Sequence, residues 1–272
     1  MLTSPALTKI AGPEDFAAAF GVSDEALHRL ATYETLLRRW QETINLVSPS
    51  TLDAIWHRHF ADSAQLVMLA PHARSWIDLG SGAGFPGLVV AILLAVASSP
   101  SPLVGEGQGG GDGRTGNVGA PPTPNPSPQG GGGPAPFRGE IAHVTLVESN
   151  ARKCAFLREV VRLTRLSASV TVDILSTRIE ATATQASLQA PDVVSARALA
   201  PLAQLFNLSA PLFTPRTVGL FLKGRDAAAE LEAAGKMWTF NAELVPSRTE
   251  PDAHIVVVRH LEAKAKSKGK MP

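Results

Sequence analysis

A glycine-rich stretch, residues 78–87 (DLGSGAGFPG), has the residue types and spacing that point most directly to chemistry. Glycines at this density permit tight turns and let a ligand approach the backbone closely. An apolar segment typical of a buried helix follows, and the free N–H groups at a helix N-terminus favour a negatively charged ligand group. The sequence therefore predicts a loop that binds a nucleotide-like cofactor.

The glycines match two loop patterns in overlapping frames. From Gly82 the stretch reads G-x-G-x-x-G, the pattern of dinucleotide-binding loops. From Asp78 it reads D-x-G-x-G-x-G, the pattern of loops that bind S-adenosylmethionine (SAM). The SAM frame gives Asp78 a task, holding the cationic aminoacyl end of SAM, and it accounts for Gly80, which the dinucleotide frame leaves unexplained. Pro86 would also lie inside the dinucleotide helix, where proline is unfavourable. The pattern favours SAM over NAD.

Ionisable residues stand at the ends of the expected strands. The apolar pattern predicts five strands, over residues 75–79, 142–147, 169–174, 192–195 and 218–222. The ionisable residues at or just after these strands are Asp78, Glu148, Arg178 with Glu180, Arg197 and Lys223. Because ligands of an open α/β sheet bind beyond the carboxyl ends of its strands, these residues predict one site.

A segment rich in glycine and proline separates Glu148 from the glycine loop. In residues 100–139, 22 of 40 are Gly or Pro, and no apolar periodicity is present. This composition predicts a disordered insertion, residues 99–139. Glu148 lies 64 positions after Gly84 (148 − 84), which becomes 24 (64 − 40) without the insertion. An acid at that spacing meets a ribose hydroxyl, and SAM and NAD both carry one.

The elements that must position these residues alternate between strand and helix. Helices are expected over residues 87–97, 151–166, 200–213 and 226–237, with a short one near Ile179, and two last strands over 238–245 and 255–261. This pattern predicts an α/β, Rossmann-like fold with a mostly parallel, doubly wound sheet and an antiparallel last strand. Residues 1–70 form a helical N-terminal extension, with a long helix over residues 49–68, residues 71–262 the sheet domain, and residues 263–272 a basic tail.

Composition excludes several classes of protein. The net charge of +1 means that nucleic-acid binding must come from a local basic surface. A single cysteine, Cys154, excludes an intrachain disulfide and favours a reducing compartment. No signal peptide is evident, and the longest apolar run, residues 88–97, is too short to span a membrane. His57 and His59 lack the further ligands that a metal site requires. We expect a cytoplasmic, monomeric protein without membrane association or metal.

Seven motifs follow one another along the chain: WQETINLVS (40–48), RHFADS (58–63), DLGSGAGFPG (78–87), LVESNARKCAFLREV (146–160), STRIE (176–180), SARALAPL (195–202) and LKG (222–224). In this order they resemble the ribosomal RNA small subunit methyltransferase G family, also called glucose-inhibited division protein B. The resemblance implies a class I SAM-dependent methyltransferase fold. It also implies methyl transfer to N7 of a guanine in 16S ribosomal RNA, guanine 527 in the 530 loop. The Gly/Pro insertion departs from the family's pattern.

The resemblance and the SAM frame together imply a set of site residues. The cofactor contacts are Asp78, Gly80, Gly82 and Phe85 from the loop, Glu148 on the ribose hydroxyls, Ile179 and Glu180 beside the adenine, and Arg197 near the methionine end or the incoming guanine. The basic positions expected to contact RNA phosphates are Arg152, Lys153, Arg178 and Lys223. The partner would be 16S ribosomal RNA or the small ribosomal subunit.

N7 of guanine carries a lone pair and no proton, so its methylation requires no general base. No Ser-His-Asp or Cys-His arrangement falls at the expected strand ends. We therefore expect no catalytic side chain but acceleration by proximity and orientation, with Arg197 and Lys223 as the candidates for a contribution. An NAD-dependent reductase of similar architecture and a non-catalytic RNA-binding module are the alternatives.

Overall fold

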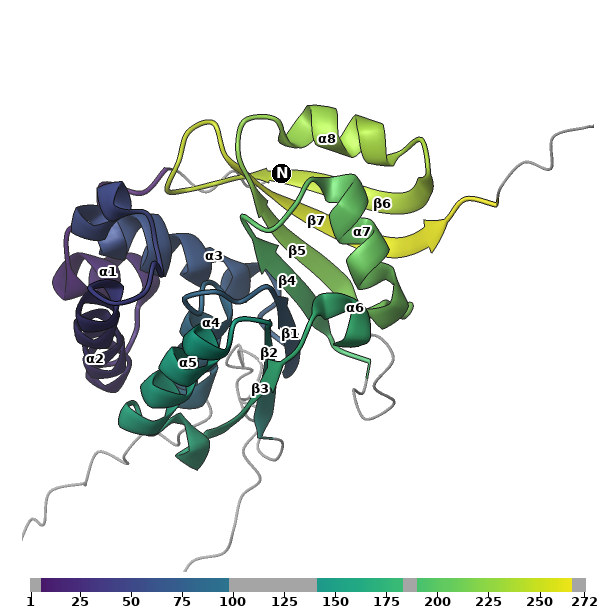
Figure 1. Ribbon diagram of the computed structural model, residues 1–272. Helices are drawn as coiled ribbons and strands as arrows, with labels where there is room; N and C mark the ends of the chain where they lie inside the picture. The colour runs from purple at the N-terminus through teal and green to yellow at the C-terminus, as the bar shows by residue number, and fades with distance from the viewer. Residues whose placement is uncertain (1–5, 98–140, 183–189, 266–272) are drawn as a thin grey trace, which may run out of the picture.

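The computed structural model describes residues 6–97, 141–182 and 190–265. The predicted insertion, residues 99–139, and residues 266–272 of the predicted basic tail lie outside this part of the chain. The described residues form one seven-stranded sheet with helices on both faces (Figure 1).

The sheet has the strand order β3-β2-β1-β4-β5-β7-β6. Its strands are β1 (Ser75–Leu79), β2 (Ala142–Glu148), β3 (Val170–Ser176), β4 (Val193–Arg197), β5 (Val218–Lys223), β6 (Trp238–Pro246) and β7 (His254–Ala263). Only β7 runs antiparallel to its neighbours β5 and β6. The predicted mostly parallel sheet with an antiparallel last strand is confirmed.

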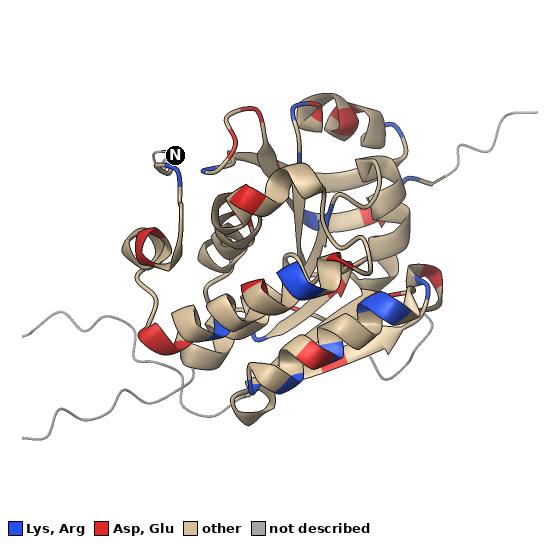
Figure 2. Cartoon of the chain, turned by 60° about the vertical axis from the view of Figure 1, so that its left-hand side comes forward, with Lys and Arg blue, Asp and Glu red and all other residues tan. Residues whose placement is uncertain are grey.

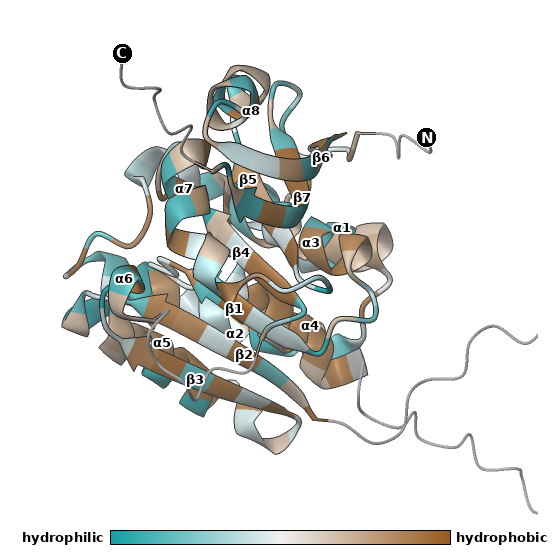
Figure 3. Cartoon of the chain, turned by 90° about the vertical axis from the view of Figure 1, so that its right-hand side faces the viewer, coloured by the Kyte–Doolittle hydropathy of each residue, from teal (hydrophilic) through white to brown (hydrophobic). Residues whose placement is uncertain are grey.

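Helices cover both faces of the sheet (Figures 1 and 3). On one face lie α4 (Gly87–Ala97) and α5 (Ala151–Leu163), with α1 (Pro13–Phe20), α2 (Asp24–Gln41) and α3 (Asp62–Leu69) of the extension outside them. On the other lie α6 (Ile179–Thr182), α7 (Leu202–Ser209) and α8 (Ala227–Ala234). None of the helices described is long and apolar enough to cross a bilayer.

Two hydrophobic cores fill the spaces between these layers. One joins the extension, α4 and α5 to the sheet, and the second joins the sheet to α7 and α8. Helix α4 is apolar on all sides because it lies between β2 on the inside and α2 and α3 on the outside. The extension therefore shares a core with the strands that carry the glycine loop.

Several predicted helices end earlier than expected. The helix from Ala151 stops at Leu163 because Arg165 adopts a left-handed backbone with φ of 52°. Helix α7 gives way to a 3-10 turn, Ala210–Leu212, where Pro211 has no N–H to continue the α-helical pattern.

The predicted long helix over residues 49–68 is wrong as a single α-helix. The segment consists of a 3-10 helix (Pro49–Ala54), a π-helix (Trp56–Ala61) and then α3. Pro49 begins the first turn. The wider π turn buries both Trp56 and Phe60, and π turns occur frequently at functional sites.

The extension also reaches the loop between β6 and β7. His57 Nε2 lies 2.9 Å from the carbonyl oxygen of Thr249, and Thr249 Oγ1 donates to Asp62 Oδ1 at 2.9 Å. Arg58 forms an ion pair with Glu250. The loop from Ser247 to Glu250 is thus held against the π-helix and the start of α3.

Candidate active site

The glycine loop connects β1 to α4 and has the backbone that its sequence predicts. Gly80, Gly82 and Gly84 have φ values of 68°, 56° and 93°, in the left-handed region that favours glycine. Helix α4 begins at Gly87, the predicted residue. A Cβ at Gly80 would lie 2.7 Å from Leu199 Cδ1, so the loop packs tightly against the segment after β4.

Asp78 lies beneath this loop. Its side chain is buried, with Oδ1 accepting from Ser195 Oγ at 2.8 Å and Oδ2 accepting from the Gly87 N–H at 3.2 Å. Burial raises the pKa of Asp78 to about 6. The hydrogen bonds act in the opposite direction, because they favour the charged form, but their effect on the pKa is smaller. The carboxylate therefore joins β1 to β4 and to the start of α4. Contact between Asp78 and the aminoacyl end of SAM stays a prediction, and in this geometry both oxygens are already bonded to the protein.

Glu148 lies against the other side of the loop. Its Oε2 accepts from the Gly82 N–H at 2.9 Å and its Oε1 accepts from the Asn150 N–H at 2.7 Å. Asn150 in turn caps α5 by accepting from two backbone N–H groups. A carboxylate oxygen accepts more than one hydrogen bond, so Glu148 can also bind two ribose hydroxyls.

The predicted adenine contacts start the short helix α6. β3 lies beside β2, with Ser176 in register with Glu148, and the Thr177 N–H donates to the Glu148 carbonyl at 3.2 Å. Ile179 is half-buried and Glu180 is exposed. The structure thus brings both residues to the sheet edge that carries Glu148.

An aromatic stack joins the extension to the loop. The Tyr33 hydroxyl on α2 donates to the Ala83 carbonyl, and the Tyr33 ring stacks on Phe85 with centroids 5.3 Å apart. His59 also stacks on Phe85, with centroids 4.8 Å apart. Burial first, and then Asp78, raises the pKa of Tyr33 well above its ordinary value, so the hydroxyl keeps its proton.

His59 is a buried, neutral side chain. Burial, followed by the charges of Arg197 and Arg58, lowers its pKa to about 3, and its Nε2 lies 2.8 Å from Thr51 Oγ1. This environment agrees with structural hydrogen bonding. Among the described residues no group of three or more His, Cys, Asp or Glu side chains is placed to hold a metal ion.

Arg197, the last residue of β4, connects the sheet edge to the extension. Its NH2 group donates to the Arg58 carbonyl at 2.7 Å, and its Nε lies 3.4 Å from Asp62 Oδ2. The guanidinium carbon is 5.9 Å from the centre of the Phe85 ring. Arg197 therefore lies between the glycine loop and a neighbouring cavity.

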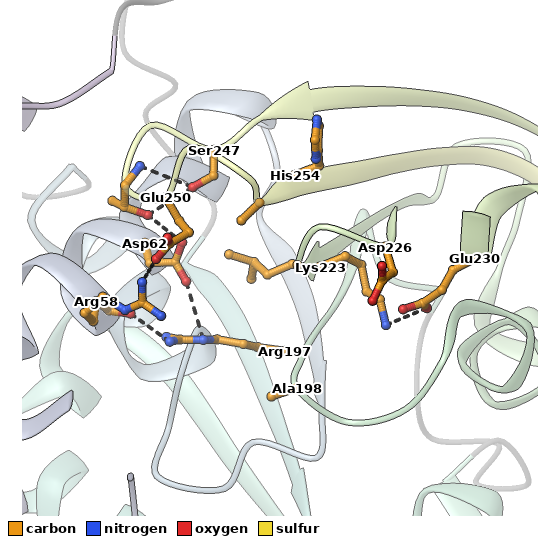
Figure 4. A pocket seen from close by; sticks show the side chains of 14 residues that line it. Arg58, Asp62, Arg197, Ala198, Lys223, Asp226, Glu230, Ser247, Glu250 and His254 are labelled. Carbon is orange, nitrogen blue, oxygen red and sulfur yellow. Dashed lines mark hydrogen bonds and ion pairs between the residues drawn. The ribbon is translucent and has the colours of Figure 1, made fainter. Parts of the chain in front are cut away.

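This cavity, of about 290 Å³, opens beyond the carboxyl ends of β4 and β5. Figure 4 shows Arg58, Asp62 and Arg197 on one side of it, and Lys223, Asp226 and Glu230 on the other. Residues of the β6–β7 loop, His254, and the strand-end residues Ala198, Leu222 and Gly224 also line it. The cavity lies beside the glycine loop, and neither Gly80 nor Glu148 lines it.

The four predicted RNA contacts do not share one surface. Arg152 and Lys153 lie in the first turn of α5 and Arg178 precedes α6, near the edge that carries Glu148. Lys223 instead lines the cavity, where its Nζ lies 2.7 Å from Glu230 Oε2 and donates to the Ala200 carbonyl at 2.9 Å. Figure 2 shows basic and acidic positions interspersed along the helices.

Several residues of this site do not figure in the sequence predictions. Asp62 and Ser195 fall inside the quoted motifs, which is the signal that could have found them. Tyr33 is the only tyrosine of the chain but lies outside every motif, and its helical spacing predicts only a core position. Glu230 lies in a helix that reads as an ordinary amphipathic segment.

Comparison with known proteins gives one consistent result. Residues 26–98 and 135–256 match the family model described as rRNA small subunit methyltransferase G. A protein of Parvibaculum lavamentivorans named ribosomal RNA small subunit methyltransferase G is 45% identical over 254 residues, covering 93% of this chain and 91% of that protein. A protein of the same name from Methylorubrum populi is 47% identical over 240 residues, covering 88% and 91%. The chain therefore belongs to the ribosomal RNA small subunit methyltransferase G family.

Proposed function

We propose that the protein transfers the methyl group of SAM to N7 of a guanine in 16S ribosomal RNA, guanine 527 of the 530 loop. Its family membership supports a ribosomal RNA substrate. The observation that carries the cofactor assignment is the contact between Glu148 and the Gly82 N–H. It places an acid with spare acceptor capacity directly against a loop of left-handed glycines.

The residues present fit SAM. The Glu148 carboxylate would bind the ribose hydroxyls, Ile179 and Glu180 would flank the adenine, and Gly80, Gly82 and Phe85 would border the methionine part. Asp78 would act by holding the loop, since its oxygens already accept from Ser195 and Gly87. Arg152, Lys153 and Arg178 would contact RNA phosphates near this edge, with Lys223 further away at the cavity.

The strand order argues against the NAD-dependent alternative. Dinucleotide-binding sheets of this type are mostly parallel and have the order 3-2-1-4-5-6, in which strand 6 pairs directly with strand 5. Here an antiparallel strand, β7, is inserted between β5 and β6. A non-catalytic RNA-binding module would not need a carboxylate, that of Glu148, hydrogen-bonded to a glycine loop.

The chemistry needs orientation more than proton transfer. SAM, when bound, supplies an electrophilic methyl group on a sulfonium ion. In the proposed transfer the lone pair of N7 would bond to the methyl carbon while the carbon–sulfur bond breaks, so the positive charge would move to the purine. The protein's residues would align the base with the loop, exclude water and stabilise that charge. A guanine in a loop can swing out of its stack to reach such a site.

The test is methyl transfer from radiolabelled SAM to RNA of a strain that lacks the modification. We expect label in 16S RNA, supplied as naked RNA or as small subunits, and mapping should place it on N7 of guanine 527. A Glu148→Gln variant has only one acceptor oxygen for the N–H groups of Gly82 and Asn150, so it should lose SAM affinity and transfer. Glu159→Gln, on the exposed side of α5, is the control. Absence of label with both substrates would refute the proposal.

A further inference from the structure

We propose that the cavity beyond β4 and β5 receives the acceptor base and binds the cationic, 7-methylated purine more tightly than the neutral one. This inference rests on the proposed function, which it deepens by assigning a place and a charge preference to the base. It concerns the 290 Å³ cavity bordered by Arg58, Asp62, Arg197, Lys223, Asp226 and Glu230.

Arg197 shows where the cavity lies relative to the glycine loop. The same guanidinium lines the cavity and lies 5.9 Å from the centre of the Phe85 ring, which follows Gly84 in the glycine loop. A base in the cavity would thus lie next to the loop that holds the methyl donor. The volume, about 290 Å³, lies just below the range for small-molecule sites, roughly 300–1,000 Å³, so the cavity suits one base and not a dinucleotide.

The lining charges give the cavity a negative excess. Three cations, Arg58, Arg197 and Lys223, face four carboxylates, Asp62, Asp226, Glu230 and Glu250, so these seven side chains balance at 3 − 4 = −1. A site of this sign repels phosphate, which leaves the RNA backbone outside. It attracts a base that has become positively charged.

The unbalanced carboxylate is that of Asp226. The other three each pair with one cation: Glu250 with Arg58, Asp62 with Arg197, and Glu230 with Lys223. Within the described part of the chain, no hydrogen bond or ion pair involves the Asp226 carboxylate, although the residue precedes α8 in the capping position. Its oxygens are therefore available to N–H groups of a ligand.

Two further features of the lining mark it as a ligand site. Ala198, directly after Arg197, has a φ of 50°, in the left-handed region that an alanine rarely adopts. Such strained backbone clusters at binding and active sites. Six buried side-chain atoms of the described residues have no hydrogen-bond partner, and two of them, Nδ1 of His254 and NH1 of Arg197, belong to residues that line this cavity; buried polar atoms are normally paired. Both features belong to the lining of the cavity that carries the negative charge excess.

The chemistry of the base fits these groups. Guanine presents N–H donors at N1 and at its exocyclic amino group, which carboxylates accept, whereas adenine lacks both in those places. Once N7 carries the methyl group the ring is a cation, and the excess carboxylate stabilises it. The same interaction lowers the energy of the transition state, in which part of that charge has already formed.

Binding of free nucleosides to the full-length protein with S-adenosylhomocysteine tests the inference. We expect 7-methylguanosine, in mildly acidic buffer where it keeps its N1 proton, to bind about tenfold more tightly than guanosine, as one close charge pair near a protein surface allows. Adenosine should bind more weakly than either. Titration calorimetry or saturation-transfer NMR would measure the three affinities.

Two variants assign the preference to a residue. Asp226→Asn should bring the ratio of the two guanosine affinities close to one, whereas Glu232→Gln, on α8 but outside the cavity lining, should preserve it. Equal affinity for both guanosines in the unmodified protein, no binding of any nucleoside, or an unchanged ratio in Asp226→Asn would each overturn the inference. Label transfer to RNA together with any of these results would leave the proposed function intact. Failure of label transfer itself would overturn the proposed function.

Discussion

Replacing Asp78 with asparagine should change how stability depends on pH. The folded protein raises the pKa of Asp78 from 3.8 to about 6, because burial penalises its charge. The contribution of this group is fully present below pH 3.8 and is lost as the pH rises through about 6. A shift of about two units corresponds to roughly 3 kcal/mol at neutral pH. Asparagine has no charge to bury, so Asp78→Asn should not suffer this loss.

The assay is urea unfolding of both proteins at several pH values between 4 and 7. The free energy of unfolding of Asp78→Asn minus that of the unmodified protein should rise by about 2.4 kcal/mol across this range, since part of the effect falls below pH 4. The difference is the proper quantity because other groups titrate too. His59, with its pKa lowered to about 3, contributes stability above pH 6.5 that is lost as the pH falls, and it is present in both proteins.

Asp192→Asn is the matched control. Burial of Asp192 is outweighed by hydrogen bonds from Arg74 and Ser75, which lower its pKa. Its stabilising contribution is present above the ordinary pKa of 3.8 and is lost only as the pH falls below that value, so the difference for this variant should stay nearly flat between pH 4 and 7. A flat difference curve for Asp78→Asn, or the same slope in both variants, would refute the reasoning.

Two other substitutions test the loop. Tyr33→Phe leaves the buried Ala83 carbonyl of the loop without its donor, which costs about 1–3 kcal/mol. Calorimetry should therefore show weaker SAM binding by this variant. The control, Ser209→Ala, loses a buried hydroxyl on the other face of the sheet and should keep its SAM affinity. Gly87→Ala places a Cβ 2.8 Å from Asp78 Oδ2 and should lower the melting temperature, whereas Gly12→Ala, with no atom within 4 Å of the new Cβ, should not. An unchanged melt for Gly87→Ala, or equal SAM affinities of Tyr33→Phe and the unmodified protein, would contradict these expectations.

The parts of the fold that local pattern controls could be predicted from the sequence. Strand β1 and helix α4 begin and end at the expected residues because an apolar run, a glycine loop and Gly87 define them within a few positions. The π turn could not be predicted, since it depends on burying Trp56 and Phe60 against distant elements. Arg165 is similar, because a left-handed arginine has no composition signal.

The residues of the candidate site likewise include some that the sequence predicts and some that it does not. Glu148 follows from its place at a strand end, and the structure puts it on the loop. The contacts of Tyr33 and Arg197 cross 50 and 139 positions of sequence, and no spacing rule encodes them. A basic charge alone does not show what Lys223 contacts. The residue lies at a strand end as expected, but its closest partner is a carboxylate of α8.

The bonds between the extension and the β6–β7 loop determine when the extension can finish folding during synthesis. His57 leaves the ribosome 192 positions before Thr249, the residue whose carbonyl it meets, and chains emerge from the N-terminus first. The extension therefore cannot complete its contacts until nearly all of the chain has been made. A product that terminates before Ser247 would contain the whole glycine loop and yet lack one wall of the cavity, so the cavity can form only after the β6–β7 loop has been made.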